Sequence, residues 1–349
     1  MAGPTRNLLI IRLSAIGDIV MATSILPGLR AKYPEARIHW LTQELGTELL
    51  AGHPALTEVW ELPRSRWKRD WQAGRRLAVL RDILGFRRRL REARFDCVID
   101  AQGLLKSGIW AWMTGAPRRV CLHGRERSGL FATEVVREPA GFGGPLCREY
   151  RHLAEHLELP MEVFGMQVVP TAEERARART TLTRLPGSPV LCFPFTTRPQ
   201  KHWFKERWSE LADRLSGDGH AVWMLGGPND LAAAEAIAAE AQAKVGIVAG
   251  PDSDLREKAA LIAQAALCIG PDTGLTHLSL ALGRPTVALF GSTCPYESTH
   301  PVPGTVLYDQ LECAPCRRHP TCEGVFTCMR HHTVERVAEA ARALLLQSS

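Results

Sequence analysis

The sequence has no apolar run that approaches the roughly 18–20 residues needed for a membrane-spanning helix. It also lacks a signal-peptide pattern, because Arg12 and Asp18 interrupt the first apolar segment early and no small-residue cleavage site follows. Internal repeats and low-complexity tracts are missing as well. We therefore expect a globular protein that stays in the cytoplasm, and 349 residues are enough for two domains with separate cores.

Positive charge is concentrated in one segment of the chain. The net charge is only +6, but residues 64–94 contain twelve basic side chains against three acidic ones. Such a segment suits nucleic acid, an anionic membrane surface or a multiply charged substrate. A solvated helix face, with arginine side chains lying over apolar surface, is the simpler alternative.

Short apolar strands alternate with helical patterns along the chain. In the first half we expect strands at Leu8–Leu13, Arg37–Thr42, Glu58–Leu62 and Cys97–Asp100. After a break rich in proline and charge at 168–189, we expect strands at 190–193, 221–225, 244–249, 266–269 and 286–290. This alternation predicts an α/β protein with two Rossmann-like domains, each a parallel sheet covered by helices on both faces. Two such domains would hold a ligand in a cleft at the carboxyl ends of their strands.

Asp18 follows the first expected strand, in the segment Arg12-Leu13-Ser14-Ala15-Ile16-Gly17-Asp18. Gly17 permits a tight turn into a helix, so the carboxylate should lie at the C-terminal edge of the strand. There it could accept a proton from a substrate hydroxyl as a general base. Capping the helix that follows is the alternative role. The turn has no Gly-x-Gly-x-x-Gly pattern, so dinucleotide binding is only weakly indicated.

Two loops in the second half carry groups that bind anions. Thr196, Thr197 and Lys201 follow a strand and offer hydroxyls and an ammonium to phosphate oxygens. Residues 270–277, Gly-Pro-Asp-Thr-Gly-Leu-Thr-His, open a helix whose N–H groups could also face a phosphate. Asp230 could contact a ribose hydroxyl. Ordinary capped turns would contain the same polar residues, so the two readings stay open.

Four of the ten cysteines cluster near the C-terminus with the spacing C-x2-C-x5-C-x5-C. They are Cys313, Cys316, Cys322 and Cys328. This spacing could hold a structural Zn²⁺ or an iron–sulfur cluster, whereas reduced or redox-labile thiols in a compact loop are the alternative. A nucleic-acid zinc ribbon is disfavoured, because the second pair of cysteines is spread too widely.

Together these segments resemble glycosyltransferase family nine, the ADP-heptose:lipopolysaccharide heptosyltransferases, and especially heptosyltransferase I. The resemblance covers nearly the whole chain. It rests on Arg12–Asp18, Val98–Ser107, Thr196–Trp203 and Asp272–His277, the last followed by Ala281–Pro285 and Phe290–Ser292. The order and separation of these segments leave little room for chance agreement.

The resemblance implies a GT-B fold. Residues 1–180 would form an acceptor-binding domain, residues 181–330 a nucleotide-sugar-binding domain, and residues 331–349 a C-terminal helix packing back toward the first domain. The implied reaction is an inverting, metal-independent transfer of heptose from ADP-L-glycero-D-manno-heptose to the Kdo region of the inner core on lipid A. No cofactor is required. The implied partners are ADP-heptose, Kdo–lipid A and the cytoplasmic face of the inner membrane, where the protein would associate peripherally, without nucleic acid.

The resemblance also assigns roles to individual residues. The implied catalytic residues are Asp18, as general base, and Lys201. The implied donor-binding residues are Thr196, Thr197, Lys201, Asp230, Asp272, Thr273, Gly274, Leu275 and His277. The implied acceptor-binding residues are Arg64, Arg66, Lys68, Gln102 and Lys106.

Two other functions compete with this interpretation. Heptosyltransferase II, or a related core transferase with another acceptor, differs only in its acceptor contacts. A non-catalytic nucleotide-sugar-binding protein would keep the loops of the second half but would not need Asp18. The chain also departs from heptosyltransferase I at two places: it has the cysteine cluster, and Cys294 stands where Asp or Ser is expected.

Overall fold

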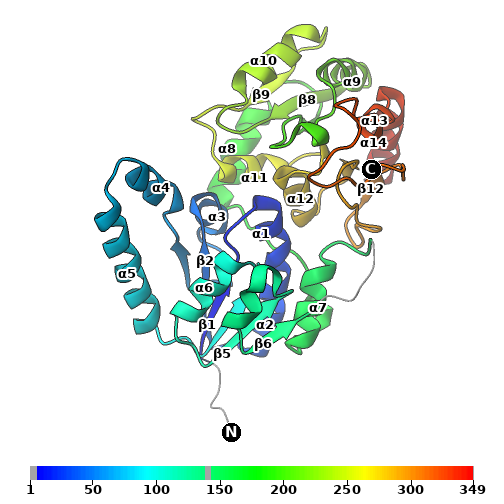
Figure 1. Cartoon of the computed structure of the whole chain (residues 1–349). Coiled ribbons are helices and arrows are strands. Elements are labelled where there is room, and N and C mark those ends of the chain that lie inside the picture. The colour runs from blue at the N-terminus through cyan, green and yellow to red at the C-terminus, as the bar shows by residue number, and fades with distance from the viewer. Residues whose placement is uncertain (1–5, 138–142, 349) are drawn as a thin grey trace. The chain divides into compact units, whose positions relative to one another are not determined.

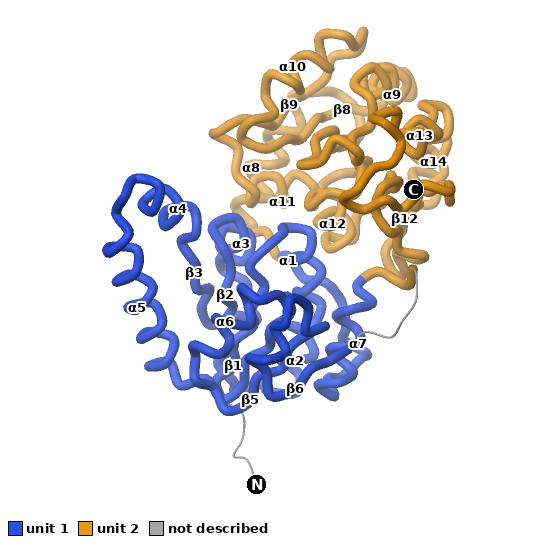
Figure 2. The backbone as a smooth tube through the Cα atoms, in the orientation of Figure 1, with its two compact units in different colours: residues 1–140, 147–168 blue, residues 141–146, 169–349 orange. Residues whose placement is uncertain are grey.

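The computed structural model describes residues 6–137 and 143–348. The chain forms two compact units, shown in separate colours in Figure 2. Unit 1 comprises residues 1–140 and 147–168, and unit 2 comprises residues 141–146 and 169–349. Residues 143–146 belong to unit 2, because Leu146 N donates to Ser298 O at 2.9 Å and Glu297 N donates to Gly144 O at 2.8 Å.

Unit 1 contains a six-stranded parallel sheet in the order β3-β2-β1-β4-β5-β6 (Figure 1). Its strands are β1 (Asn7–Ile11), β2 (Arg37–Thr42), β3 (Glu58–Glu61), β4 (Cys97–Asp100), β5 (Arg118–Leu122) and β6 (Glu134–Val136). The central strands are buried on both faces, which explains their predominantly apolar sequences. The strand order reverses between β1 and β4, so the loops after these two strands flank the crevice where such sheets bind ligands.

The helices of unit 1 are α1 (Ile16–Ala22), α2 (Leu26–Lys32), α3 (Glu44–Leu50), α4 (Arg64–Gln72), α5 (Arg76–Glu92), α6 (Leu105–Met113) and α7 (Arg148–His156). The basic segment 64–94 forms two helices, α4 and α5. The break lies at residues 73–75, where Gly74 has a φ of +79° that interrupts the helix. Trp60, Phe86 and Phe95 pack with the apolar strand residues in the core beneath α5.

Unit 2 repeats the same strand order, β12-β11-β10-β7-β8-β9. Its strands are β7 (Ser188–Cys192), β8 (His220–Leu225), β9 (Gly246–Val248), β10 (Leu267–Pro271), β11 (Thr286–Leu289) and β12 (Gly304–Leu307). Its helices are α8 (Ala172–Leu182), α9 (Lys205–Gly217), α10 (Leu231–Glu240), α11 (Leu255–Ile262), α12 (Gly274–Ala281), α13 (Thr327–Arg330) and α14 (Val334–Ser348). Here the order reverses between β7 and β10, which places the loops after those strands side by side.

The boundary between the units differs from the expected one at residue 180. It falls at Val168, because α8 belongs to unit 2: Glu174 on α8 forms an ion pair with Arg256 on α11 at 2.6 Å. The C-terminal helix also differs from the expectation. It does not form a separate segment; Val337 and Ala341 of α14 are fully buried in the core of unit 2.

No helix in residues 6–137 or 143–348 combines the length and the apolar character that crossing a bilayer requires.

Candidate functional site

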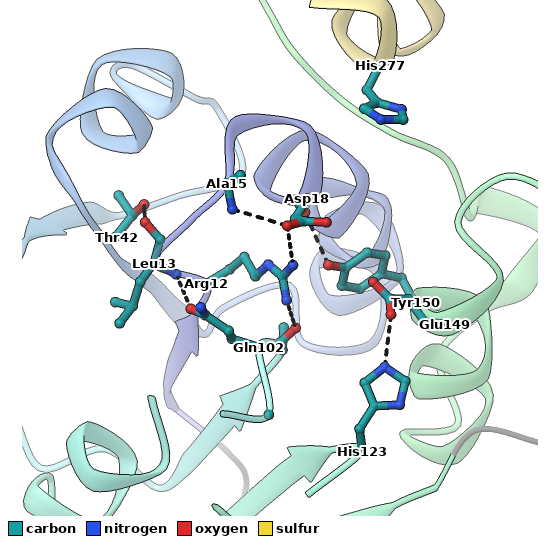
Figure 3. Close-up of polar contacts among 12 residues, drawn as sticks. Arg12, Leu13, Ala15, Asp18, Thr42, Gln102, His123, Glu149, Tyr150 and His277 are labelled. Atoms are coloured by element: carbon teal, nitrogen blue, oxygen red, sulfur yellow. Dashed lines mark hydrogen bonds and ion pairs between the residues drawn. The ribbon is translucent and has the colours of Figure 1, made fainter. Parts of the chain in front are cut away.

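The turn after β1 fixes the carboxylate of Asp18. Ala15 is the N-cap of α1, and Asp18 lies three positions later. Its Oδ2 accepts a hydrogen bond from Ala15 N at 3.1 Å and forms an ion pair with Arg12 Nη2 at 2.7 Å (Figure 3). Asp18 therefore supports the helix start without being the N-cap residue. Both contacts use Oδ2, so within the described residues Oδ1 stays available to accept a proton.

Arg12 forms an ion pair with Asp18 and is itself held by a hydrogen bond to the residue that follows β4. Its side chain is buried, and Nη1 donates to Ala101 O, just after β4, at 3.0 Å. Burial alone would lower the pKa of Arg12, but Tyr150, Asp18 and Glu149 raise it overall, so the guanidinium stays charged. The structure thus pairs a buried permanent cation with a carboxylate that is partly exposed.

The loop after β4 keeps this turn in place. Gln102 Oε1 accepts from Leu13 N at 2.9 Å (Figure 3). Asp100 Oδ1 accepts from Gln102 N and Gly103 N at 3.0 Å each. Gly103 has a φ of +64°, and a Cβ there would lie 1.7 Å from Leu122 O, so only glycine fits. Burial raises the pKa of Asp100, while the hydrogen bonds that it accepts act in the opposite direction.

A second polar group behind Asp18 was not expected from the sequence. Tyr150 is fully buried and donates from Oη to Asp18 O at 3.2 Å (Figure 3). Its neighbour Glu149 contacts His123 Nε2 at 2.8 Å. Burial would raise the pKa of Glu149, but His123 and Arg12 hold it below its usual value. These residues come from distant parts of unit 1, and no sequence spacing indicates their contact.

Of the residues expected to bind the acceptor, Gln102 contacts this turn and Lys106 lies within electrostatic reach of Arg12. The pKa of Lys106 on α6 is lowered by partial burial and then by the charges of Arg64 and Arg12, so both guanidinium groups lie within electrostatic reach of Lys106. Arg66 forms an ion pair with Asp82 at 2.8 Å. Lys68 is exposed on α4, and Gln102 is buried and engaged with Leu13. Acceptor binding by these residues stays a prediction.

In unit 2, the loops after β7 and β10 meet through Lys201 and Asp272. Lys201 Nζ donates to Asp272 O at 3.1 Å and forms a short ion pair with Asp272 Oδ2. Asp272 Oδ1 contacts His277 Nε2 at 3.0 Å, and Thr293 Oγ1 donates to Oδ2 at 2.7 Å. Burial would raise the pKa of Asp272, but His277 and Lys201 hold it far below its usual range. The Asp272 carboxylate therefore stays ionised and fixes the position of the Lys201 ammonium, where the strand order of the second sheet reverses.

The other residues expected to bind the donor shape the loops around this cluster. Thr196 Oγ1 donates to Arg198 O at 2.8 Å and accepts from Arg198 N at 3.3 Å, whereas Thr197 is exposed. Thr273 is the N-cap residue of α12, and Gly274 and Leu275 begin that helix. Asp230 Oδ2 accepts from Gly227 N at 2.6 Å, which closes the loop before α10. Their contacts with a donor stay predictions.

The C-terminal cysteines are all unpaired thiols. Burial raises the pKa of Cys328 to about 11, with smaller contributions from Cys313, Cys316 and Cys322, which therefore lie nearby. Within the described chain, no three His, Cys, Asp or Glu side chains are arranged so that they could hold a metal ion.

Comparison with known proteins decides the family. Residues 83–326 match the model of glycosyltransferase family 9 (heptosyltransferase). The chain belongs to this family. The match confirms the resemblance inferred from the sequence motifs, and this family 9 member is accordingly a glycosyltransferase.

Relatives align with this glycosyltransferase over almost its full length. Lipopolysaccharide heptosyltransferase 1 of Pseudomonas aeruginosa is 31% identical over 328 residues, covering 90% of this chain and 87% of the relative. Lipopolysaccharide heptosyltransferase 2 of Escherichia coli K12 is 27% identical and covers 98% and 99%. The solved structure of the E. coli ADP-heptose heptosyltransferase II has a TM-score of 0.77 at 25% identity, covering 98% and 99%. The expected GT-B fold of two parallel-sheet domains is thereby confirmed.

Proposed function

We propose that this glycosyltransferase moves heptose from ADP-L-glycero-D-manno-heptose to the Kdo region of the lipopolysaccharide inner core on lipid A, with inversion and without a metal ion. The observation that carries the proposal is the Asp18 carboxylate at the carboxyl end of β1, fixed by Arg12 and Ala15 with one oxygen left unengaged. An oxygen so placed can take the proton from an acceptor hydroxyl while that hydroxyl attacks the anomeric carbon.

The charges around Asp18 support an anionic acceptor. Arg12 and Arg64 both act electrostatically on Lys106, and Kdo and the phosphates of lipid A carry negative charge at neutral pH. A cationic surrounding attracts such an acceptor.

The cluster in unit 2 supports a diphosphate leaving group. Lys201 supplies a positive charge, and α12 begins at Gly274 with its N–H groups directed out of the helix. These groups could stabilise the charge that develops on ADP as the bond to heptose breaks, which is the task of a divalent cation in metal-dependent transferases. The proposal therefore assigns this task to Lys201 and the helix N-terminus.

Release of ADP from ADP-heptose tests the proposal directly. Release should depend on a deacylated Kdo–lipid A acceptor and should be unchanged by EDTA. It should collapse in Asp18→Ala, while calorimetry shows that ADP-heptose still binds. No release with any core acceptor, despite tight ADP-heptose binding, would refute the transfer reaction, and no binding would refute the donor.

A second candidate is transfer to an inner core that already carries one heptose. It is favoured by the nearly full-length similarity, in sequence and in structure, to heptosyltransferase II of E. coli. Parallel assays with Kdo-terminated and heptose-terminated acceptors separate the two candidates, because only the preferred acceptor should give rapid ADP release.

The proposed site of action is the cytoplasmic face of the inner membrane, with peripheral attachment. The excess of basic side chains in residues 64–94 supports attraction to a surface that contains anionic lipids. Fractionation of cells that produce the protein tests this placement: it should sediment with membranes at low salt and be released at high salt.

A further inference from the structure

The outer face of α5 carries a row of leucine side chains. Leu77, Leu80 and Leu84 are three and four positions apart, so they lie on one side of the helix. They are 84%, 47% and 60% exposed. The opposite side of α5 already buries Val79 and Phe86 in the core of unit 1. Folding of unit 1 therefore does not require the outer leucines, and a second apolar row on a surface helix needs another explanation.

Arginine side chains share this face with the leucines. Arg81, Arg88 and Arg91 follow Leu77 by four, eleven and fourteen positions, which keeps them on the same side of the helix. At the adjoining end of α4, Trp71 is 46% exposed, with the guanidinium of Arg76 5.5 Å from the centre of its ring. Figure 1 shows α4 and α5 together at the margin of unit 1. We call the exposed leucines, Trp71 and these arginines the α5 outer face.

The positive charge of this region is largely unpaired. Three of the twelve basic residues in 64–94 form ion pairs within the described chain: Arg66 with Asp82, Arg75 with Asp70, and Arg88 with Glu92. A surface hollow beside Leu84 is lined by Arg87, Arg88, Arg91, Glu92 and Arg94. Mutual repulsion among these cations is relieved when an anionic surface lies against them.

We propose that the α5 outer face docks on a bilayer containing anionic lipids. The leucines and Trp71 enter the boundary between headgroups and acyl chains, while the arginines lie at the level of the lipid phosphates. Nucleic acid would use the arginines but leave three leucines in water, whereas a bilayer satisfies both kinds of side chain. Tryptophan at the edge of the patch suits the same boundary, because its ring is apolar and its N–H is polar.

This inference rests on the membrane association proposed above and gives it a specific surface, but it does not depend on the sugar that is transferred. The first experiment is cosedimentation of the full-length protein with phosphatidylcholine vesicles, with and without phosphatidylglycerol. Binding should require phosphatidylglycerol and weaken at high salt. The triple variant Leu77→Ser, Leu80→Ser, Leu84→Ser should lower the partition coefficient on the order of a hundredfold, because it removes most of the apolar insertion.

Two further variants separate the contributions. Replacing Arg81, Arg88 and Arg91 with Gln should lower partitioning roughly fivefold for each charge removed. Leu346→Ser is the matched control, because Leu346 is 79% exposed on α14, outside the α5 outer face, and this variant should bind vesicles like the wild type. Thermal unfolding curves that match that of the wild type verify that the variants fold. If the triple serine variant does not fold, the single variant Leu77→Ser replaces it in the vesicle assay.

Wild-type binding by the triple serine variant would overturn the proposal, since the arginines alone would then account for the attraction. Preferential binding to duplex nucleic acid, with no vesicle binding, would also overturn it. A transfer assay with a water-soluble, deacylated acceptor keeps the two proposals distinct. The triple serine variant should retain the wild-type rate there and lose rate only on acceptor embedded in vesicles. Failure of transfer by the wild type would leave the vesicle result standing.

Discussion

Replacing Asp18 with asparagine tests the general base with the smallest structural change. Asparagine keeps the side-chain oxygen that accepts from Ala15 N, so α1 should still begin at Ile16. The amide cannot take a proton at neutral pH. Because positioned general bases typically contribute about 10²–10⁴-fold, kcat should fall by roughly that factor. Affinity for ADP-heptose should not change, since the proposed donor groups lie in unit 2.

The same substitution should cost little stability. Arg12 loses an ion pair to a partly exposed carboxylate but keeps its hydrogen bond to Ala101 O. We expect the free energy of unfolding to fall by about 1–2 kcal/mol, against the roughly 5–15 kcal/mol that is usual for a domain. A fall in kcat of several hundredfold could therefore not come from unfolding.

The assay measures ADP release at saturating acceptor, together with ADP-heptose affinity by calorimetry. Asp96→Asn is the matched control: Asp96 Oδ2 accepts from Arg6 N and Asn7 N at 2.8 Å each, at the opposite, amino end of β1. It should turn over like the wild type. A near-wild-type kcat for Asp18→Asn would refute the general-base role and leave Asp18 with the helix start alone.

Three further predictions concern the loops. Lys201→Gln should weaken ADP-heptose binding by about 10–100-fold in calorimetry, since it removes a charge-assisted contact; unchanged affinity would exclude Lys201 from the donor site. Gly103→Ala should lower the free energy of unfolding in urea by roughly 2–4 kcal/mol, because its Cβ would overlap Leu122 O, whereas Gly85→Ala, in open space on α5, should raise it by about 0.5–1 kcal/mol. The lowered pKa of Asp272 means that its ionised form stabilises the folded state above the unfolded-state pKa and that this stability is lost as pH falls below about 4. Thermal unfolding from neutral to acid pH should show this loss in the wild type and a flatter profile in Asp272→Asn.

The central strands were predictable because parallel strands buried on both faces have continuous apolar sequences. Arg37–Thr42 and Cys97–Asp100 begin and end where the sequence indicated. The strands β5, β6 and β12 were not predicted. β5 begins with two arginines, β6 has only three residues and lies at the edge of its sheet, and β12 begins at a glycine at the other sheet's edge, so none gives a clear apolar signal.

The candidate site was partly predictable, because the strand order brings together the loops that follow neighbouring strands. The sequence places Lys201 after one strand and Asp272 after another, and the strand order makes these strands neighbours. The support around Asp18 was not predictable. Tyr150 reaches it from α7, 132 residues away, and the buried Gln102 accepts a hydrogen bond from Leu13 N, a contact that the sequence did not indicate. Such contacts depend on the packing of distant elements, and residue spacing carries no signal for them.

Each unit orients one charged side chain after a central strand through an ion pair with an oppositely charged side chain. In unit 1, the carboxylate after β1 is oriented by Arg12, which is anchored to Ala101 after β4. In unit 2, the ammonium of Lys201 after β7 is oriented by Asp272 after β10. A free lysine side chain would lose about 1.5–2 kcal/mol of rotamer entropy if a diphosphate ordered it, so, under the proposed donor role of Lys201, the ion pair with Asp272 removes much of that cost in advance.

Asp272 is suited to release Lys201 as well as to hold it. If Lys201 turned toward a diphosphate, as the proposed donor role requires, the buried carboxylate would keep its contacts with His277 and Thr293 and would not be left as an isolated charge. A carboxylate with Lys201 as its sole partner would resist this exchange, because an unpaired buried ion costs several kcal/mol. If Lys201 takes the role proposed above, the three-partner arrangement lets its ammonium be ordered in the free protein and still move to the donor diphosphate.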